Sequence, residues 1–124
     1  MKNKKQTMLV IDDEISMMQV LRDVFETRGW RVLTAPTGIA GLEILKNEKV
    51  NIALLDICLP GKTGIHILKI VKKKYPNIPV VMITALGYDD KLVNEAFKQG
   101  ASSYISKGTP LGELIEAVHN ALLR

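Results

Sequence analysis

Five short apolar runs divide the chain at regular intervals. They cover residues 8–11, 31–35, 52–55, 80–83 and 103–106. The first, third and fourth runs are almost continuously apolar, which is typical of strands buried on both faces of a parallel sheet. We therefore predict five strands at these positions.

Helical patterns follow each of these runs. Apolar residues recur there at intervals of three and four, and glycine or proline ends several of the stretches. The five stripes consist of Ile15, Met18, Leu21 and Phe25; Ile39, Leu42 and Leu45; Ile65, Leu68 and Val71; Leu92, Val93, Ala96 and Phe97; and Leu111, Leu114, Ile115, Val118 and Leu122. This (βα)5 alternation predicts right-handed crossovers and an α/β fold in which helices cover both faces of a doubly wound, five-stranded parallel sheet.

Composition and charge agree with one folded domain over residues 1–124. Hydrophobic residues make up 47% of the chain and charged residues 24%, which provides for a core. Three of the +4 net charges come from Lys2, Lys4 and Lys5, and we expect residues 1–6 to form a flexible basic tail. Because the few aromatic residues do not interleave with the lysines, we expect no direct nucleic-acid binding by this domain.

The sequence also bears on the cellular compartment. No apolar run approaches the roughly 20 residues that span a bilayer, and the first residues lack the apolar segment of a signal peptide. The single cysteine, Cys58, has no partner for an internal disulfide, which agrees with a reducing compartment. We therefore expect a cytoplasmic protein that does not contact the membrane.

Polar residues stand where the apolar runs end. The first run leads into Asp12 and Asp13, the third into Asp56, the fourth into Thr84 and the fifth into Lys107. Parallel strands have their carboxyl ends at one edge of the sheet, and open α/β sheets bind ligands at that edge where the strand order reverses. With strand order 2-1-3-4-5, Asp12, Asp13 and Asp56 are expected to share one pocket.

Clustered carboxylates need a compensating cation. Two unit charges 4 Å apart repel by about 4 kcal/mol at an effective dielectric of 20, and Mg²⁺ favours carboxylates, water and phosphate oxygens as ligands. Lys107 adds a second positive charge and Thr84 a hydroxyl donor, which completes the parts that phosphoryl transfer requires. An acidic helix N-cap is an alternative account of Asp12 or Asp13, but it does not account for Asp56 within an apolar segment.

Four segments resemble the receiver domains of bacterial two-component response regulators. They are VIDDE, LLDICLPGKTG, MITA and SYISKG, which occur in the order expected for that family. The resemblance implies a flavodoxin-like fold and a phosphorylation-dependent signalling switch. Asp56 would accept a phosphoryl group from a phosphohistidine of a sensor histidine kinase or phosphotransfer protein. The chain would catalyse its own phosphorylation and dephosphorylation, but would act primarily as a switch that signals a partner or output domain.

The same resemblance assigns a metal site. It implies Mg²⁺, or another divalent cation such as Mn²⁺, with Asp13 as a direct ligand and Asp12 as a ligand mainly through water. Asp56 and the backbone carbonyl of Cys58 are the further ligands. The phosphoryl oxygens would be held by Thr84 and Lys107.

The resemblance also implies a switch formed by Thr84 and Tyr104. Tyr104 matches the aromatic residue that moves between outward and inward positions on activation, and we expect it outward or mixed in the unphosphorylated domain. The chain departs from the common family pattern at Gly108, where proline usually follows the lysine. A cis bond costs about 2.5–4 kcal/mol before a residue other than proline. We therefore predict a trans Lys107–Gly108 bond, with the ammonium of Lys107 still directed toward Asp56.

Three other functions are compatible with such a fold. A degenerate, binding-only receiver module would normally have lost one of the acids, the threonine or the lysine, and all are present. An aspartate-nucleophile phosphatase carries a second acid two residues after its nucleophile, where this chain has Cys58. An FMN carrier needs a phosphate loop rich in Gly, Ser and Thr, whereas the first loop here is acidic. The oligomeric state stays open, with a homodimer through the fourth helix, fifth strand and fifth helix among the options.

Overall fold

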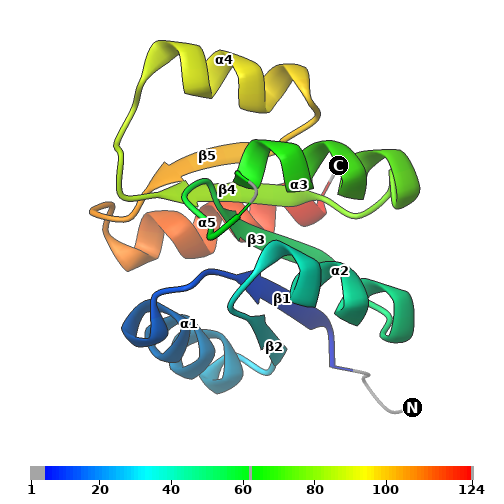
Figure 1. Cartoon of the computed structure of the whole chain (residues 1–124). Helices are drawn as coiled ribbons and strands as arrows, with labels where there is room; N and C mark the ends of the chain where they lie inside the picture. Colours follow the sequence, from blue (N-terminus) through cyan, green and yellow to red (C-terminus); the bar gives the residue numbers. More distant parts are fainter. Residues whose placement is uncertain (1–4, 62, 124) are drawn as a thin grey trace.

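The computed structural model describes residues 5–61 and 63–123, and in this part of the chain strands and helices alternate throughout (Figure 1). The elements are β1 (Thr7–Ile11), α1 (Ile15–Thr27), β2 (Arg31–Ala35), α2 (Gly38–Asn47), β3 (Ile52–Asp56), α3 (Gly64–Lys74), β4 (Val80–Thr84), α4 (Asp90–Lys98), β5 (Ser103–Ser106) and α5 (Leu111–Leu122). The strands form one parallel sheet in the order β2-β1-β3-β4-β5. The predicted (βα)5 fold and strand order are therefore confirmed.

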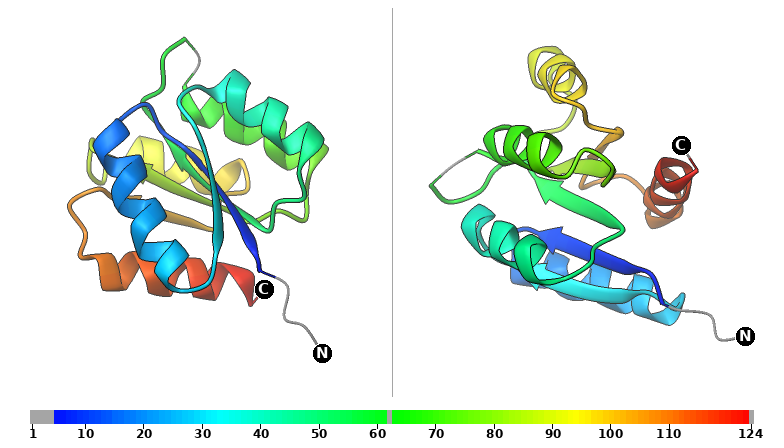
Figure 2. Two further views of the ribbon diagram at one scale, coloured as in Figure 1. Left: turned by 90° about the horizontal axis from the view of Figure 1, so that it is seen from below. Right: turned by 90° about the vertical axis from the view of Figure 1, so that its right-hand side faces the viewer.

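Alternating strand residues divide the core into two layers. In β1, Leu9 and Ile11 pack on one face of the sheet, whereas Met8 and Val10 pack on the other. The first face is covered by α2, α3 and α4, and the second by α1 and α5 (Figure 2). Because β1, β3 and β4 are buried along their whole length, their sequences are apolar on both faces, as expected for central parallel strands.

Side-chain caps fix the first turns of three helices. The hydroxyl of Thr37 accepts a hydrogen bond from the backbone N–H of Ala40 at the start of α2, and Thr63 caps α3 in the same way. The carboxylate of Asp89 accepts hydrogen bonds from two backbone N–H groups at the start of α4. These bonds satisfy donors that a helix N-terminus otherwise leaves free, and they place the helix starts at the edge of the sheet where the strands end.

The start of α3 lies very close to the end of β3. A side chain at Gly64 would place its Cβ 2.7 Å from the Cα of Ile57 and 2.8 Å from the carbonyl carbon of Asp56. The backbone N–H of Gly64 donates a hydrogen bond to the Ile57 carbonyl oxygen at 2.7 Å. Glycine therefore permits the approach that sets the backbone position of Asp56.

The described residues include only the last part of the expected tail. Residues 1–4 lie outside them; Lys5 and Gln6 are exposed, and the Gln6 carbonyl accepts a hydrogen bond from the backbone N–H of Arg31. The helices within residues 5–61 and 63–123 are all too short or too polar to cross a bilayer.

Candidate active site

Asp12 and Asp56 lie side by side at the carboxyl edge of the sheet. Asp12 directly follows β1 and Asp56 ends β3, and these two strands are neighbours. Both residues are buried, with exposed fractions of 2% and 3%. The backbone N–H of Asp12 donates to the carbonyl of Ala35, which ties the end of β1 to β2. The predicted meeting of these two acids is found in the structure.

Asp13 completes an acidic cluster with these two residues. One carboxylate oxygen from each of Asp12, Asp13 and Asp56 lies within 4.8 Å of the others, and Asp13 is the exposed member. A hard divalent cation such as Mg²⁺ prefers oxygen ligands of this kind. The oxygen donors and the surplus of negative charge therefore fit a divalent cation that one exposed acid contacts from the solvent side.

The ammonium group of Lys107 contacts Asp12, Asp56 and a third acid, Glu14. Its Nζ lies 3.0 Å from Asp12 Oδ2, 2.9 Å from Glu14 Oε1 and 3.1 Å from Asp56 Oδ2. Its backbone N–H donates to the carbonyl of Thr84 at 2.8 Å, which fixes the turn after β5. The Lys107–Gly108 bond is trans, as are all peptide bonds in the described residues. Both parts of the prediction for this lysine are therefore confirmed.

Burial and charge shift the pKa values of the two central groups. The pKa of Asp56 is raised, mainly by burial and also by the charge of Asp12, although the Cys58 N–H and Lys107 act in the opposite direction. Burial alone would lower the pKa of Lys107, but its hydrogen bonds with Glu14, Asp12 and Asp56 outweigh that effect and raise it. Lys107 therefore stays cationic across the physiological pH range. Any additional positive charge near Asp56 would stabilise the ionised form of its carboxylate.

Thr84 and Cys58 flank the acidic cluster in different ways. Thr84 ends β4, is fully buried, and accepts a hydrogen bond from the backbone N–H of Leu86 through its hydroxyl oxygen at 3.0 Å. Since β4 pairs with β3, the carboxyl ends of the two strands are adjacent. The side chain of Cys58 is exposed, and its backbone N–H donates to Asp56 Oδ1 at 3.1 Å.

Tyr104 faces inward in this structure. The side chain is buried on β5, and its hydroxyl donates a hydrogen bond to the carbonyl of Gly87 at 3.0 Å. The ring of Tyr88 packs against it, with the two ring centres 5.8 Å apart. The expectation of an outward or mixed ring is therefore wrong for this structure. The physical reason is that the loop between β4 and α4 supplies both a hydrogen-bond acceptor and an aromatic surface.

Glu14 is a member of the site that the sequence did not single out. It is the N-cap residue of α1, but its side chain makes no capping hydrogen bond and instead reaches Lys107. Its backbone N–H donates to Asp12 Oδ1 at 2.9 Å. The only signal in the sequence was its position directly after the two aspartates.

Five exposed apolar side chains lie at the same edge of the sheet as the acidic cluster. Ile15, Ile39 and Leu111 stand at the starts of α1, α2 and α5, and Leu86 and Tyr88 lie in the loop after β4. Because each helix begins at the edge where a strand ends, these residues lie around the same edge as the acids. Exposed apolar side chains at the edge that carries a polar site can serve as contacts for a protein partner.

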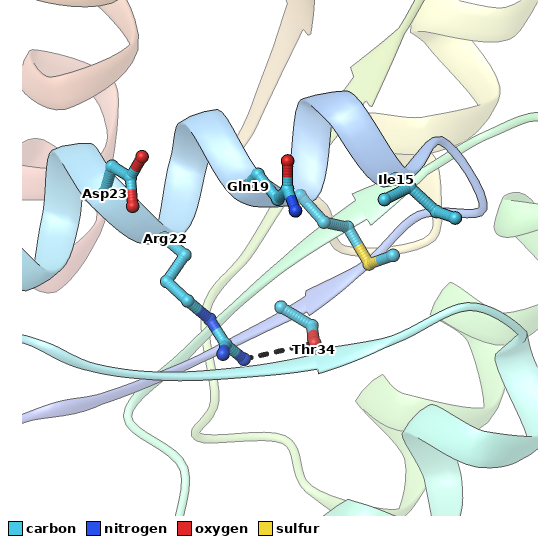
Figure 3. Close-up of a pocket in the computed structure, with 6 residues that line it drawn as sticks. Ile15, Gln19, Arg22, Asp23 and Thr34 are labelled. Carbon is cyan, nitrogen blue, oxygen red and sulfur yellow. Dashed lines mark hydrogen bonds between the residues drawn. The ribbon is translucent and has the colours of Figure 1, made fainter.

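An open groove of about 520 Å³ extends from this edge along α1 (Figure 3). It begins at Ile15 and is lined further along by Gln19, Arg22 and Asp23, with Thr34 of β2 on its other side. The guanidinium of Arg22 donates to the Thr34 hydroxyl at 3.3 Å. Ile15 and Met18 are the apolar residues of its lining, and the other lining residues are polar.

Comparison with known proteins gives a consistent result. A family model described as "Response regulator receiver domain" matches residues 8–119. Sporulation initiation phosphotransferase F of Bacillus subtilis is 34% identical over 122 residues, which cover 98% of this chain and 96% of that protein. The DNA-binding transcriptional regulator NtrC of Escherichia coli is 33% identical over 113 residues, which cover 91% of this chain and 24% of that protein. The chain thus spans nearly all of the first relative and about a quarter of the second.

Solved structures of response regulator proteins also resemble this chain. A CheY-like response regulator receiver domain protein from Methanospirillum hungatei superposes with a TM-score of 0.91 at 28% identity, covering 96% of this chain and 94% of that one. The response regulator TrrA from Thermotoga maritima, solved in complex with Mg(2+)-BeF, superposes with a TM-score of 0.85 at 26% identity. That match covers 94% of this chain and 99% of the other.

Proposed function

Because this chain belongs to the response regulator receiver domain family, we propose that it accepts a phosphoryl group on Asp56 and thereby changes conformation. One observation carries the assignment of the acceptor: Asp56 is a buried carboxylate that lies beside two further acids and 3.1 Å from the ammonium of Lys107. A buried acid at that position has no packing role that an apolar residue would not fill better.

Receiver domains bind Mg²⁺ at an acidic site, and in this chain Asp12, Asp13 and Asp56 would hold the ion. When bound, Mg²⁺ supplies positive charge to the phosphoryl oxygens. A carboxylate oxygen of Asp56 attacks the phosphorus, and the bond from phosphorus to the nitrogen of the donor histidine breaks. The histidine nitrogen keeps the bonding electron pair. The ammonium of Lys107 stabilises the negative charge that the phosphoryl group brings to this buried position.

The hydroxyl of Thr84 couples the phosphoryl group to the loop after β4. A phosphoryl group adds about −1.5 to −2 charge and three strong acceptor oxygens. The Thr84 hydroxyl is free to donate its proton to one of these oxygens, while its oxygen accepts a hydrogen bond from the Leu86 N–H. Any movement of the Thr84 side chain toward the phosphoryl group therefore acts directly on this loop. The same loop holds the Gly87 carbonyl that accepts from Tyr104. We propose that this loop and Tyr104 together form the element that changes conformation.

The phosphoryl donor is proposed to be a sensor histidine kinase or a phosphotransfer protein. Exposed Ile15, Ile39 and Leu86 around the acids support a macromolecular donor, since a small phosphodonor needs no apolar contact surface. The groove along α1 is continuous with this surface through Ile15. We propose that the donor protein contacts this edge and presents its phosphohistidine to Asp56.

Incubation with acetyl phosphate and Mg²⁺, followed by intact-protein mass spectrometry, tests the proposal. The parent chain should gain the mass of one phosphoryl group, and Asp56→Asn should gain none. Asp90→Asn is the matched control, because it removes an exposed acid at the start of α4. The proposal is wrong if Asp56→Asn is labelled as well as the parent, or if the parent is labelled equally in EDTA.

A further inference from the structure

The ammonium of Lys107 is fully occupied in this structure. It has three N–H donors, and it lies within 3.1 Å of three carboxylates, those of Asp12, Glu14 and Asp56. Phosphorylation converts the Asp56 carboxylate into an acyl phosphate, so the N–H that Lys107 donates to Asp56 can pass to a phosphoryl oxygen. A second N–H can bind the phosphoryl group only if Asp12 or Glu14 loses its hydrogen bond from the ammonium. The identity of that carboxylate decides how Lys107 responds to phosphorylation.

The three carboxylates differ sharply in their exposure to water. The side chains of Asp12 and Asp56 are 2% and 4% exposed, whereas that of Glu14 is 53% exposed. A buried carboxylate that loses its cationic partner is costly, because no water replaces the lost hydrogen bond. Water solvates Glu14 at once, and exposed ion pairs contribute little to stability. Glu14 is therefore the partner that is released most easily.

We infer that Glu14 is a positioning residue that holds the Lys107 ammonium before phosphorylation and releases it to the phosphoryl group on Asp56. This inference rests on the proposed function. Local structure gives independent support, because the Glu14 side chain makes no capping hydrogen bond at the start of α1 and its carboxylate lies 2.9 Å from the Lys107 ammonium. The Glu14–Lys107 ion pair has to break when the ammonium moves to the phosphoryl group, so its free energy of formation opposes phosphoryl binding.

The exposure of Glu14 to water sets the expected strength of this ion pair. Exposed ion pairs change an equilibrium constant by about 1.4- to 5-fold. Removing the Glu14 carboxylate should therefore tighten binding of a phosphoryl mimic to Asp56 by a factor in this range. The effect should arise from the broken pair, and not only from the loss of one negative charge near an anion.

Titration with beryllofluoride at saturating Mg²⁺, followed by NMR, measures this factor. Glu14→Gln removes the charge, and Glu14→Asp keeps the charge but withdraws the carboxylate from Lys107 by one methylene group. Proton exchange of the Lys107 ammonium reports whether the ion pair is broken in each variant. Glu26→Gln is the matched control, because it removes an exposed acid from the same helix away from the site. In metal-free protein, the ¹⁵N resonance of the Lys107 ammonium should also show faster proton exchange in Glu14→Gln than in the parent, which a merely structural role would not produce.

We expect both Glu14 variants to bind beryllofluoride about 1.4- to 5-fold more tightly than the parent, with Glu26→Gln unchanged. Unchanged or weaker binding by Glu14→Gln overturns the inference and leaves the proposed function intact. Tighter binding by Glu14→Gln with parent-like binding by a Glu14→Asp variant whose Lys107 ammonium exchanges as fast as in Glu14→Gln also overturns it, because charge alone would then explain the effect. Failure of the parent to bind beryllofluoride overturns the proposed function and this inference with it.

Discussion

Replacing Gly64 with alanine should disturb the backbone that carries Asp56. The new Cβ would lie 2.7 Å from the Cα of Ile57 and 2.8 Å from the carbonyl carbon of Asp56. Both neighbours are backbone atoms that cannot rotate away, and the Gly64–Ile57 hydrogen bond of 2.7 Å holds the two segments together. Either the start of α3 or the end of β3 must therefore move.

Overpacking of this kind typically costs about 1–3 kcal/mol of unfolding free energy. Unfolding entropy near 60 °C is about 2.1 cal/mol/K per residue, which for 124 residues converts that cost into a Tm lowered by about 4–12 °C. Gly112→Ala is the matched control, because a Cβ at this position of α5 meets no atom within 4 Å. Because Gly112 lies in the first turn of α5, that change should stabilise the protein by at most the roughly 0.5–1 kcal/mol of a helix interior and raise Tm by at most about 2–4 °C.

Thermal unfolding followed by circular dichroism in EDTA measures both variants. We expect Tm to fall for Gly64→Ala and to rise for Gly112→Ala. Phosphorylation by acetyl phosphate and Mg²⁺ should also slow in Gly64→Ala alone, because only that change displaces Asp56. If Gly64→Ala unfolds at or above the Tm of the parent, the contact between α3 and β3 does not set the position of Asp56 as described.

Three further predictions concern the acids and the switch. Asp13→Ala should weaken Mg²⁺ binding more than Asp12→Ala, because the first is proposed as a direct ligand and the second as a ligand through water; calorimetric titration that gives the reverse order would overturn these roles. Burial raises the pKa of Asp56 above its ordinary value of 3.8, so the folded state holds that proton more tightly and metal-free stability falls as pH rises through the raised pKa. Asp56→Asn should therefore raise Tm in EDTA at pH 7 and lose this advantage toward pH 4, and a lower Tm than the parent at pH 7 would contradict the shift. Tyr104→Phe removes the hydrogen bond to Gly87 and should lower the unfolding free energy by about 0.5–1.5 kcal/mol in urea denaturation, whereas unchanged stability would show that the bond is not formed in solution.

The strands could be predicted because central parallel strands are apolar on both faces. The predictions ended one residue early at β3 and β4, where Asp56 and Thr84 are the last strand residues. Each polar side chain breaks the apolar run, but the backbone ladder continues through it. Hydrophobicity therefore locates the core of a strand but ends it one residue early, at the polar residue that belongs to the site.

The convergence of the acids and the lysine could be predicted from topology, but the pairing of Lys107 with Glu14 could not. These two residues are 93 positions apart, and the contact depends on the rotamers of two long side chains. The inward position of Tyr104 depends on the loop after β4, where Gly87 has a φ of 74° and its carbonyl accepts a hydrogen bond from the Tyr104 hydroxyl. Neither a rotamer nor a loop torsion is encoded in hydrophobic periodicity.

Locating the phosphoryl group on the chain tests the central claim most directly. The protein is phosphorylated with acetyl phosphate and Mg²⁺, digested under conditions that preserve acyl phosphates, and mapped by tandem mass spectrometry. We predict that the added mass lies on the peptide that contains Asp56, and that EDTA abolishes it. Mg²⁺-dependent label on a peptide without Asp56, such as one that carries His119, would contradict the account.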